Sequence, residues 1–264
     1  MQSMEKQRRL AMGVEYDGTL YHGWQYQPHA PSIQECLNAA ISVVADAPTT
    51  CIGSGRTDTG VHAAGQVVHF ETRAERSLRS WQLGINSNLP DDINIIWIKE
   101  VDAQFHARYS AVKRTYRYTI LNRPVRSALA RHRAWWLRQP LDESAMAGSV
   151  ECLLGLHDFS SFRAAGCQSH SPLRDMKRID VRRKRDWIFV DCQANAFLHH
   201  MVRNIVGSLV EIGRGERPVD WMQTLLAARD RKLAGITAPA MGLVLTRIDY
   251  PVYFGLDGLS SSDL

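Results

Sequence analysis

The sequence lacks several features that would place it in a common class of protein. No apolar run approaches the roughly 18 residues that a membrane-spanning helix needs. The five cysteines are scattered and none stands in a C-x-x-C pair, which argues against a zinc site or a disulfide framework. The first residues are polar and contain no apolar signal core. We therefore expect a cytoplasmic protein with no membrane association.

Cofactor motifs are also missing from the sequence. It contains no P-loop, no dinucleotide fingerprint and no cluster with metal-ligand spacing. His199 and His200 are adjacent, and on the helix we predict there they would point about 100° apart. We therefore expect neither a metal nor an organic cofactor. The excess of 32 Lys and Arg over 27 Asp and Glu, a net charge of +5, is compatible with a polyanionic partner but does not identify one.

Hydrophobic periodicity predicts the order β-α-β-β-α-β within the first hundred residues. Residues 10–16 alternate between apolar and polar side chains, as a half-buried strand does. Ser32 and Glu35 form a capping box, after which apolar residues recur at helical spacing. The other elements expected in this half are strands at 51–53, 66–71 and 93–98 and a helix at 80–87.

The same order of elements recurs in the second half. We predict strands at 114–121, 178–183, 187–194 and 243–248, and helices at 141–154, 197–212 and 221–228. Two successive units of this order are typical of the ferredoxin-like topology. We therefore expect an α+β fold in which two βαββαβ units form a broad, mixed, mostly antiparallel sheet. The helices would lie on one side and leave the other face free for a large partner such as folded RNA.

Two domains follow from this repeat of elements. Residues 1–105 are predicted to form an N-terminal α/β domain that carries the loop around Asp58. Residues 106–264 are predicted to form a C-terminal α/β domain. The tail, 254–264, ends in small and polar residues and is expected to be disordered.

Residues 53–62 (Gly-Ser-Gly-Arg-Thr-Asp-Thr-Gly-Val-His) form the most distinctive stretch of the chain, and we call it the glycine loop. Its three glycines allow tight turns and a close approach of the backbone to a ligand. Asp58, its only carboxylate, could act on a substrate, or it could simply cap its own backbone in an Asx-turn. To act as a nucleophile, Asp58 must stay ionised, and the candidate cations to favour that are Arg56 and Arg203.

Tyr116 lies in a predicted strand in which basic and aromatic residues alternate. Its ring could pack against a nucleobase while neighbouring cations meet phosphate, or it could be an ordinary cross-strand packing residue. Basic segments at 123–126, 131–133 and 182–185 could contact phosphates or be solvated turns. Two other readings stay open from the residues alone, an RNA-binding module without catalysis and, from Asp58-Thr-Gly60, a dimeric aspartic protease.

The chain resembles the tRNA pseudouridine synthase A family. Residues 55–63 (Gly-Arg-Thr-Asp-Thr-Gly-Val-His-Ala) are similar to the signature G-R-T-D-x-G-V-H-A of that family. Further blocks of resemblance follow in order along almost the whole chain, at residues 15–19, 23–25, 32–35, 66–70, 88–90, 105–108, 114–118, 158–162, 194–207 and 242–243.

The resemblance implies an isomerase that converts uridine to pseudouridine at positions 38, 39 and 40, in the anticodon stem and loop of tRNA. It implies that Asp58 is the catalytic aspartate and Tyr116 the tyrosine that packs on the target base. Arg203 would pair with the aspartate, Leu243 would line an apolar pocket, and Arg56 would hold RNA or fill the place of the flipped base. The family acts as a homodimer on tRNA without a cofactor.

Overall fold

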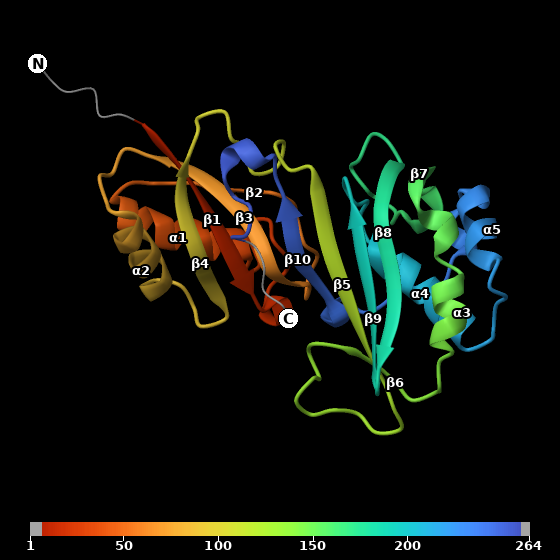
Figure 1. The fold of residues 1–264 in the computed structure, drawn as a ribbon. Helices are drawn as coiled ribbons and strands as arrows, with labels where there is room; N and C mark the ends of the chain where they lie inside the picture. Colours follow the sequence, from red (N-terminus) through yellow and green to blue (C-terminus); the bar gives the residue numbers. More distant parts are fainter. Residues whose placement is uncertain (1–6, 260–264) are drawn as a thin grey trace, which may run out of the picture. The chain divides into compact units, whose positions relative to one another are not determined.

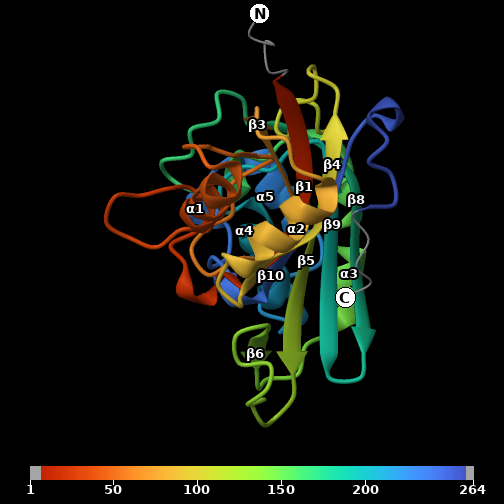
Figure 2. The same ribbon diagram turned by 90° about the vertical axis from the view of Figure 1, so that its left-hand side faces the viewer.

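The computed structural model describes residues 7–259, which form two compact units (Figures 1 and 2). One unit contains the chain up to Val112 and again from Leu245 onward, and the other contains Lys113–Val244. The described residues include ten strands and five α-helices. Of the seven strand pairings described below, six are antiparallel and one is parallel. The predicted α+β class is therefore confirmed.

The first unit has the βαββαβ order that the sequence predicted. Its elements are β1 (Arg8–Tyr16), α1 (Ile33–Ala45), β2 (Ile52–Gly53), β3 (His62–Thr72), α2 (Leu78–Ser87) and β4 (Ile93–Val101). Strand β1 lies between β4 and β3, antiparallel to both, and the short β2 pairs with β3 on its other side. This arrangement is the split βαβ topology.

The two helices of this unit bury one face of its sheet. Ser32 caps α1 by accepting the backbone N–H of Glu35, and Ile33, Leu37 and Ile41 then form its buried stripe. On α2, Trp81 is fully buried, and its ring centroid lies 5.3 Å from that of Phe70 on β3. The main core of the unit therefore lies between the helices and the side of β3 that carries Phe70.

The opposite face of this sheet is not left free, contrary to our expectation. His69 points away from the helices because successive strand residues alternate, and its ring packs edge-on against Phe105, with centroids 6.0 Å apart. Phe105 in turn contacts Tyr250 and Phe254, and Leu256 is also buried. A second, smaller core thus covers this face, built from chain segments that no local pattern connects.

The second unit repeats the order of elements with additions. Along the chain it contains β5 (Lys113–Asn122), β6 (Trp135–Leu137), α3 (Glu143–Gly148), β7 (Gly155–Asp158), β8 (Leu173–Lys184), β9 (Trp187–Ala194), α4 (Met201–Gly213) and α5 (Trp221–Ala228). The strands follow the order β5-β9-β8-β7, and β6 pairs in parallel with the end of β5. Strand β10 (Leu243–Asp249) runs across the boundary between the two units.

Four local predictions in the second unit were wrong. The helix expected at 141–154 is only α3, since it ends at Gly148 and a 3-10 turn, Glu151–Leu153, follows. The helix expected from residue 197 begins at Met201, because His200 has a positive φ of 62°. The strand predicted at 178–183 is longer at both ends, since β8 runs from Leu173 to Lys184. The short strands β6 and β7 were missed.

The start of the tail that we expected to be disordered is packed instead. Val252–Phe254 form a 3-10 turn, and Phe254 contacts Phe105 edge-on. The rest of that prediction, residues 260–264, lies outside the described part of the chain. The domain boundary predicted at 105 stays a prediction, because compactness alone does not test independent folding. Among the helices of residues 7–259, none is long and apolar enough to cross a membrane.

Candidate active site

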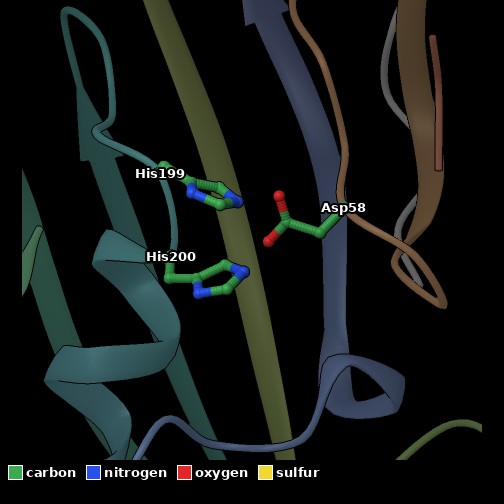
Figure 3. A group of neighbouring side chains, drawn as sticks. All are labelled: Asp58, His199 and His200. Carbon is green, nitrogen blue, oxygen red and sulfur yellow. The ribbon is translucent and has the colours of Figure 1, made fainter. Parts of the chain in front are cut away.

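The glycine loop presents Asp58 from the turn between β2 and β3. The carboxylate is half-buried and projects from the loop, as Figure 3 shows. The Val61 N–H donates to the Asp58 carbonyl at 3.1 Å, and Gly60 adopts φ 76°, which suits a glycine. Arg56 stands two residues earlier in the same loop, and its side chain is exposed.

Residues 18–24 fasten the glycine loop from the outside. The Trp24 N–H donates to Thr57 O at 3.0 Å, and the Gly60 N–H donates to Tyr21 O at 3.3 Å. A Cβ atom added to Gly18 would lie 2.0 Å from the carbonyl oxygen of Val61, so only glycine fits there. Backbone contacts on both sides of Asp58 therefore fix the position of the backbone from which its side chain projects.

Buried side-chain hydrogen bonds fasten the loop from the inside. The hydroxyls of Tyr16 and Thr57 are 2.8 Å apart, and both residues are buried. Gln66 Nε2 donates to Gly55 O at 3.0 Å, and the Ser54 hydroxyl donates to Gln66 Oε1 at 2.5 Å. Because an unmade bond to a buried polar group is costly, these contacts keep the loop in one conformation.

Tyr116 lies on β5 opposite Cys192 of β9. Its ring meets the ring of Phe197 edge-on, with centroids 5.0 Å apart, so the packing role that we considered is present. The ring is nevertheless only half-buried. Part of its surface therefore remains accessible for contact with a planar ligand.

Arg203 lies in the first turn of α4 and is tied to the segment that leads into β10. Its Nε donates to Ala238 O at 2.7 Å, and the Ala238 N–H donates back to Arg203 O at 3.1 Å. One residue further on, Pro239 O accepts the hydroxyl of Tyr118 at 2.7 Å. Burial raises the pKa of Tyr118, whereas the charge of Arg203 acts to lower it.

Leu243 follows this segment as the first residue of β10, and its side chain is buried. The preceding Gly242 is in close contact with Tyr118, since an added Cβ would lie 2.6 Å from its ring. Arg203, Leu243 and the Tyr118 region thus form one connected group in the second unit. Arg56 and Asp58 belong to the first unit.

The two adjacent histidines do not have the geometry that we expected. They precede α4, as Figure 3 shows, and the left-handed conformation of His200 turns its ring toward that of His199. The ring centroids are 3.9 Å apart. On a helix the two imidazole rings would point apart. They do not, because α4 begins only after both residues, at Met201.

Some residues that build the site carried no readable role in the sequence. The resemblance covered residues 15–19 and 23–25, but gave no reason for their presence. The structure supplies one, because Gly18 and Trp24 belong to residues 18–24, the segment that holds the glycine loop in place and that we call the clamp. Tyr118 lies on the same strand as Tyr116, and no local pattern indicates its bond to Pro239, because that residue lies far along the chain.

Comparison with known proteins assigns the chain to a class of RNA-modifying enzymes. The family described as "tRNA pseudouridine synthase" matches residues 12–110 and 150–251. The matched residues lie in both units and include the glycine loop and strand β9. Tyr116 lies between the two matched ranges. The chain belongs to the tRNA pseudouridine synthase family and is therefore an isomerase.

The relatives narrow this assignment to one branch. The chain is 52% identical over 266 residues to the tRNA pseudouridine synthase A of Klebsiella pneumoniae strain 342, covering 100% of this chain and 98% of that protein. It is 52% identical to the protein of the same name from Hydrogenovibrio crunogenus, covering 94% of each chain. With the protein of that name from Actinobacillus pleuropneumoniae serotype 7 the identity is 53%, over 94% of this chain and 95% of the relative.

Proposed function

We propose that this protein isomerises uridine to pseudouridine at positions 38, 39 and 40 of the tRNA anticodon stem and loop, with Asp58 as the acting carboxylate. The full-length similarity to proteins named tRNA pseudouridine synthase A supports the substrate class. The observation that carries the role of Asp58 is its position at the centre of a loop clamped on both sides.

The reaction itself is an internal rearrangement. The N1–C1′ glycosidic bond of uridine breaks, a C5–C1′ bond forms, C5 loses its proton, and N1 gains one. Atoms and charge balance without an oxidant, a reductant or an external group, so the proposed reaction uses no cofactor. The task left to the protein is to expose the base, hold it, and offer one reactive group in a fixed position.

Asp58 is suited to act as that group because its loop leaves the carboxylate little freedom. Three routes remain open to it: addition to C6 of the uracil, attack on C1′, and removal of the C2′ proton. Each route needs an ionised carboxylate, and each needs the base to leave its stack, at a cost of a few kcal/mol. Base flipping is therefore part of the proposal.

The other residues have supporting roles in this proposal. Tyr116 packs on the flipped uracil, and its half-exposed ring is suitable for that contact. Arg203 pairs with the carboxylate of Asp58, and the Ala238 carbonyl holds its guanidinium in one direction. Leu243 lines the apolar side of the base pocket, and Arg56, which is exposed, contacts RNA.

The proposed partners are tRNA and a second copy of the chain. We propose a cytoplasmic homodimer in which one tRNA contacts both subunits. The test of the whole proposal is to incubate pure protein with unmodified tRNA transcripts and to map pseudouridine along them. We expect modification at positions 38 to 40 and none in a transcript that carries cytidine there. Modification confined to other positions, or none at all, would reject the assigned targets.

A further inference from the structure

The loop between β5 and β6 is the basic segment in which arginines are most concentrated without an acidic neighbour in sequence. We call residues 123–134 (Arg-Pro-Val-Arg-Ser-Ala-Leu-Ala-Arg-His-Arg-Ala) the arginine loop. It contains four arginines and no acidic residue, and it lies within a longer stretch, 103–141, that has nine Lys or Arg and no Asp or Glu. Such a local excess of one sign attracts a polyanion.

The base of the arginine loop is firmly built. Strand β6 pairs with β5 through Ile120, Leu121 and Asn122, and Trp136 Nε1 donates to Arg123 O at 2.9 Å. Arg123 folds back on the loop, with its Nε donating to Val125 O at 2.7 Å. The loop then projects beyond the end of β5, as Figure 1 shows in yellow-green.

The tip of the arginine loop, residues 125–131, is largely exposed. Arg126 and Arg131 are both exposed, and among residues 7–259 neither of them forms an ion pair. Leu129 stands between them and is 97% exposed, and Val125 is 69% exposed. An aliphatic side chain left in water forgoes the free energy that burial would supply. The folded unit does not use this tip for its own stability.

The hairpin between β8 and β9, the other arginine-rich segment, shows the contrast. Arg182 pairs with the buried Asp191 at 3.1 Å and stacks over Phe189. Arg183 Nη2 donates to Asn122 Oδ1 at 3.0 Å and to Leu141 O at 2.8 Å. These two arginines have protein partners that hold them, whereas Arg126 and Arg131 have their charges available for an outside ligand.

We infer that the arginine loop grips the sugar-phosphate backbone of the tRNA away from the nucleotide being modified. Arg126 and Arg131 contact phosphates, and Leu129 lies against the sugar and base edges between them. This inference rests on the proposed function, since it takes the partner to be tRNA. RNA is favoured over an anionic membrane because the tip offers only two aliphatic side chains, Leu129 and Val125, and no aromatic anchor.

The test is tRNA affinity measured over a range of salt concentrations for the variant Arg126→Gln/Arg131→Gln. Binding should weaken by about 10 to 100-fold, and the slope of log K against log salt should become shallower by roughly 1.5, since each lost phosphate contact removes about 0.7 to 0.9. The rate at saturating tRNA should stay within about 2-fold, because the chemistry lies elsewhere. An unchanged slope would overturn the inference.

The matched control removes two charges from the β8–β9 hairpin, as Lys184→Gln/Arg185→Gln. Its slope should change by less than half as much as that of the loop variant. Equal losses in the two variants would mean that only net charge matters, and would overturn a specific role for the loop. Leu129→Ser should weaken binding by about 3 to 10-fold with no change of slope, and unchanged affinity would remove Leu129 from the contact.

Two further outcomes separate this inference from others. Loss of binding to anionic vesicles with full retention of tRNA binding would assign the loop to a membrane surface and reject our reading. Failure of the proposed function has a different result, since the wild-type protein would then make no pseudouridine. If pseudouridine forms normally while the loop variant matches the wild type in slope, only the inference about the loop has failed.

Discussion

The glycine loop and the arginine loop both connect strands, but they are built in opposite ways. The glycine loop is fastened at Thr57, Gly60 and Gly55 by bonds to three different parts of the first unit. The arginine loop is fastened at its base, and its tip is exposed. Chemistry needs a reactive atom held in place, whereas a grip on a long, charged backbone needs reach and charge.

The largest effect is expected where the glycine loop packs against Gly18, because this contact holds the loop in place. Gly18→Ala places a Cβ atom 2.0 Å from Val61 O, a backbone atom that cannot rotate away. We expect a loss of about 3 kcal/mol in the free energy of unfolding, measured by denaturant titration. Gly55→Ala is the control, because no heavy atom lies within 4 Å of its added Cβ, and it should cost less than about 0.5 kcal/mol. Equal costs for the two variants would show that the clamp is not tight.

A second prediction concerns pH and the strand that follows the glycine loop. Burial, helped by the charges of His106 and Arg9, lowers the pKa of His69 on β3 to about 4. Between pH 6.5 and 4 the unfolded chain therefore binds a proton there that the folded chain does not. Stability should fall by about 3 kcal/mol as the pH drops through this window, and it should not depend on this group above pH 6.5.

The variant His69→Asn tests the assignment, since an amide oxygen can still accept the Ala107 N–H that His69 Nδ1 accepts at 3.1 Å. Its stability, measured by denaturant titration at each pH, should have a shallower dependence between pH 6.5 and 4 than that of the wild type. The same dependence in both proteins would place the acid sensitivity elsewhere.

The inner fastening of the glycine loop should give a smaller effect. Tyr16→Phe and Thr57→Val each remove one hydroxyl from the buried pair, and each should cost about 1 to 2 kcal/mol by leaving the other hydroxyl without its partner. The double variant should cost clearly less than the sum of the two, which a double-mutant cycle measures. Strict additivity would mean that this bond does not hold the loop.

The smallest effect is expected at the tip of the arginine loop. Leu129→Ser should change the free energy of unfolding by less than about 0.5 kcal/mol, because the side chain is 97% exposed and gains nothing from folding. Thermal or denaturant unfolding checks this value. A clear destabilisation would show that the tip is part of the folded unit and would remove the contrast between the two loops.

Periodicity and caps predicted the elements that depend on local residues. The alternation at 10–16 and the Ser32 cap each defined a real element, β1 and α1. Local patterns failed where the backbone adopts a conformation that the neighbouring residues do not indicate. Leu198 and Met201 fit a helical stripe, yet the left-handed His200 between them delays α4. The second core around Phe105, Tyr250 and Phe254 joins segments nearly 150 residues apart, and no window of sequence contains both.

The candidate site divides in the same way. The glycine loop was visible because its residues are contiguous and distinctive. The clamp was not, since the need for glycine at residue 18 depends on where Val61 O lies after folding. Tyr116 was placed correctly on a strand, but its contact with Phe197 required the true start of α4. The roles of Arg56, Arg203 and Leu243 stay predictions.

The most direct test of the central role of Asp58 is tritium release from tRNA labelled at C5 of uridine, compared between the wild type and Asp58→Asn. Isomerisation removes the C5 hydrogen, so release reports the chemistry itself. We predict that release by the variant falls by at least about 1,000-fold, while its affinity for tRNA stays within about 3-fold of the wild type. Undiminished release by Asp58→Asn would show that another group performs the reaction.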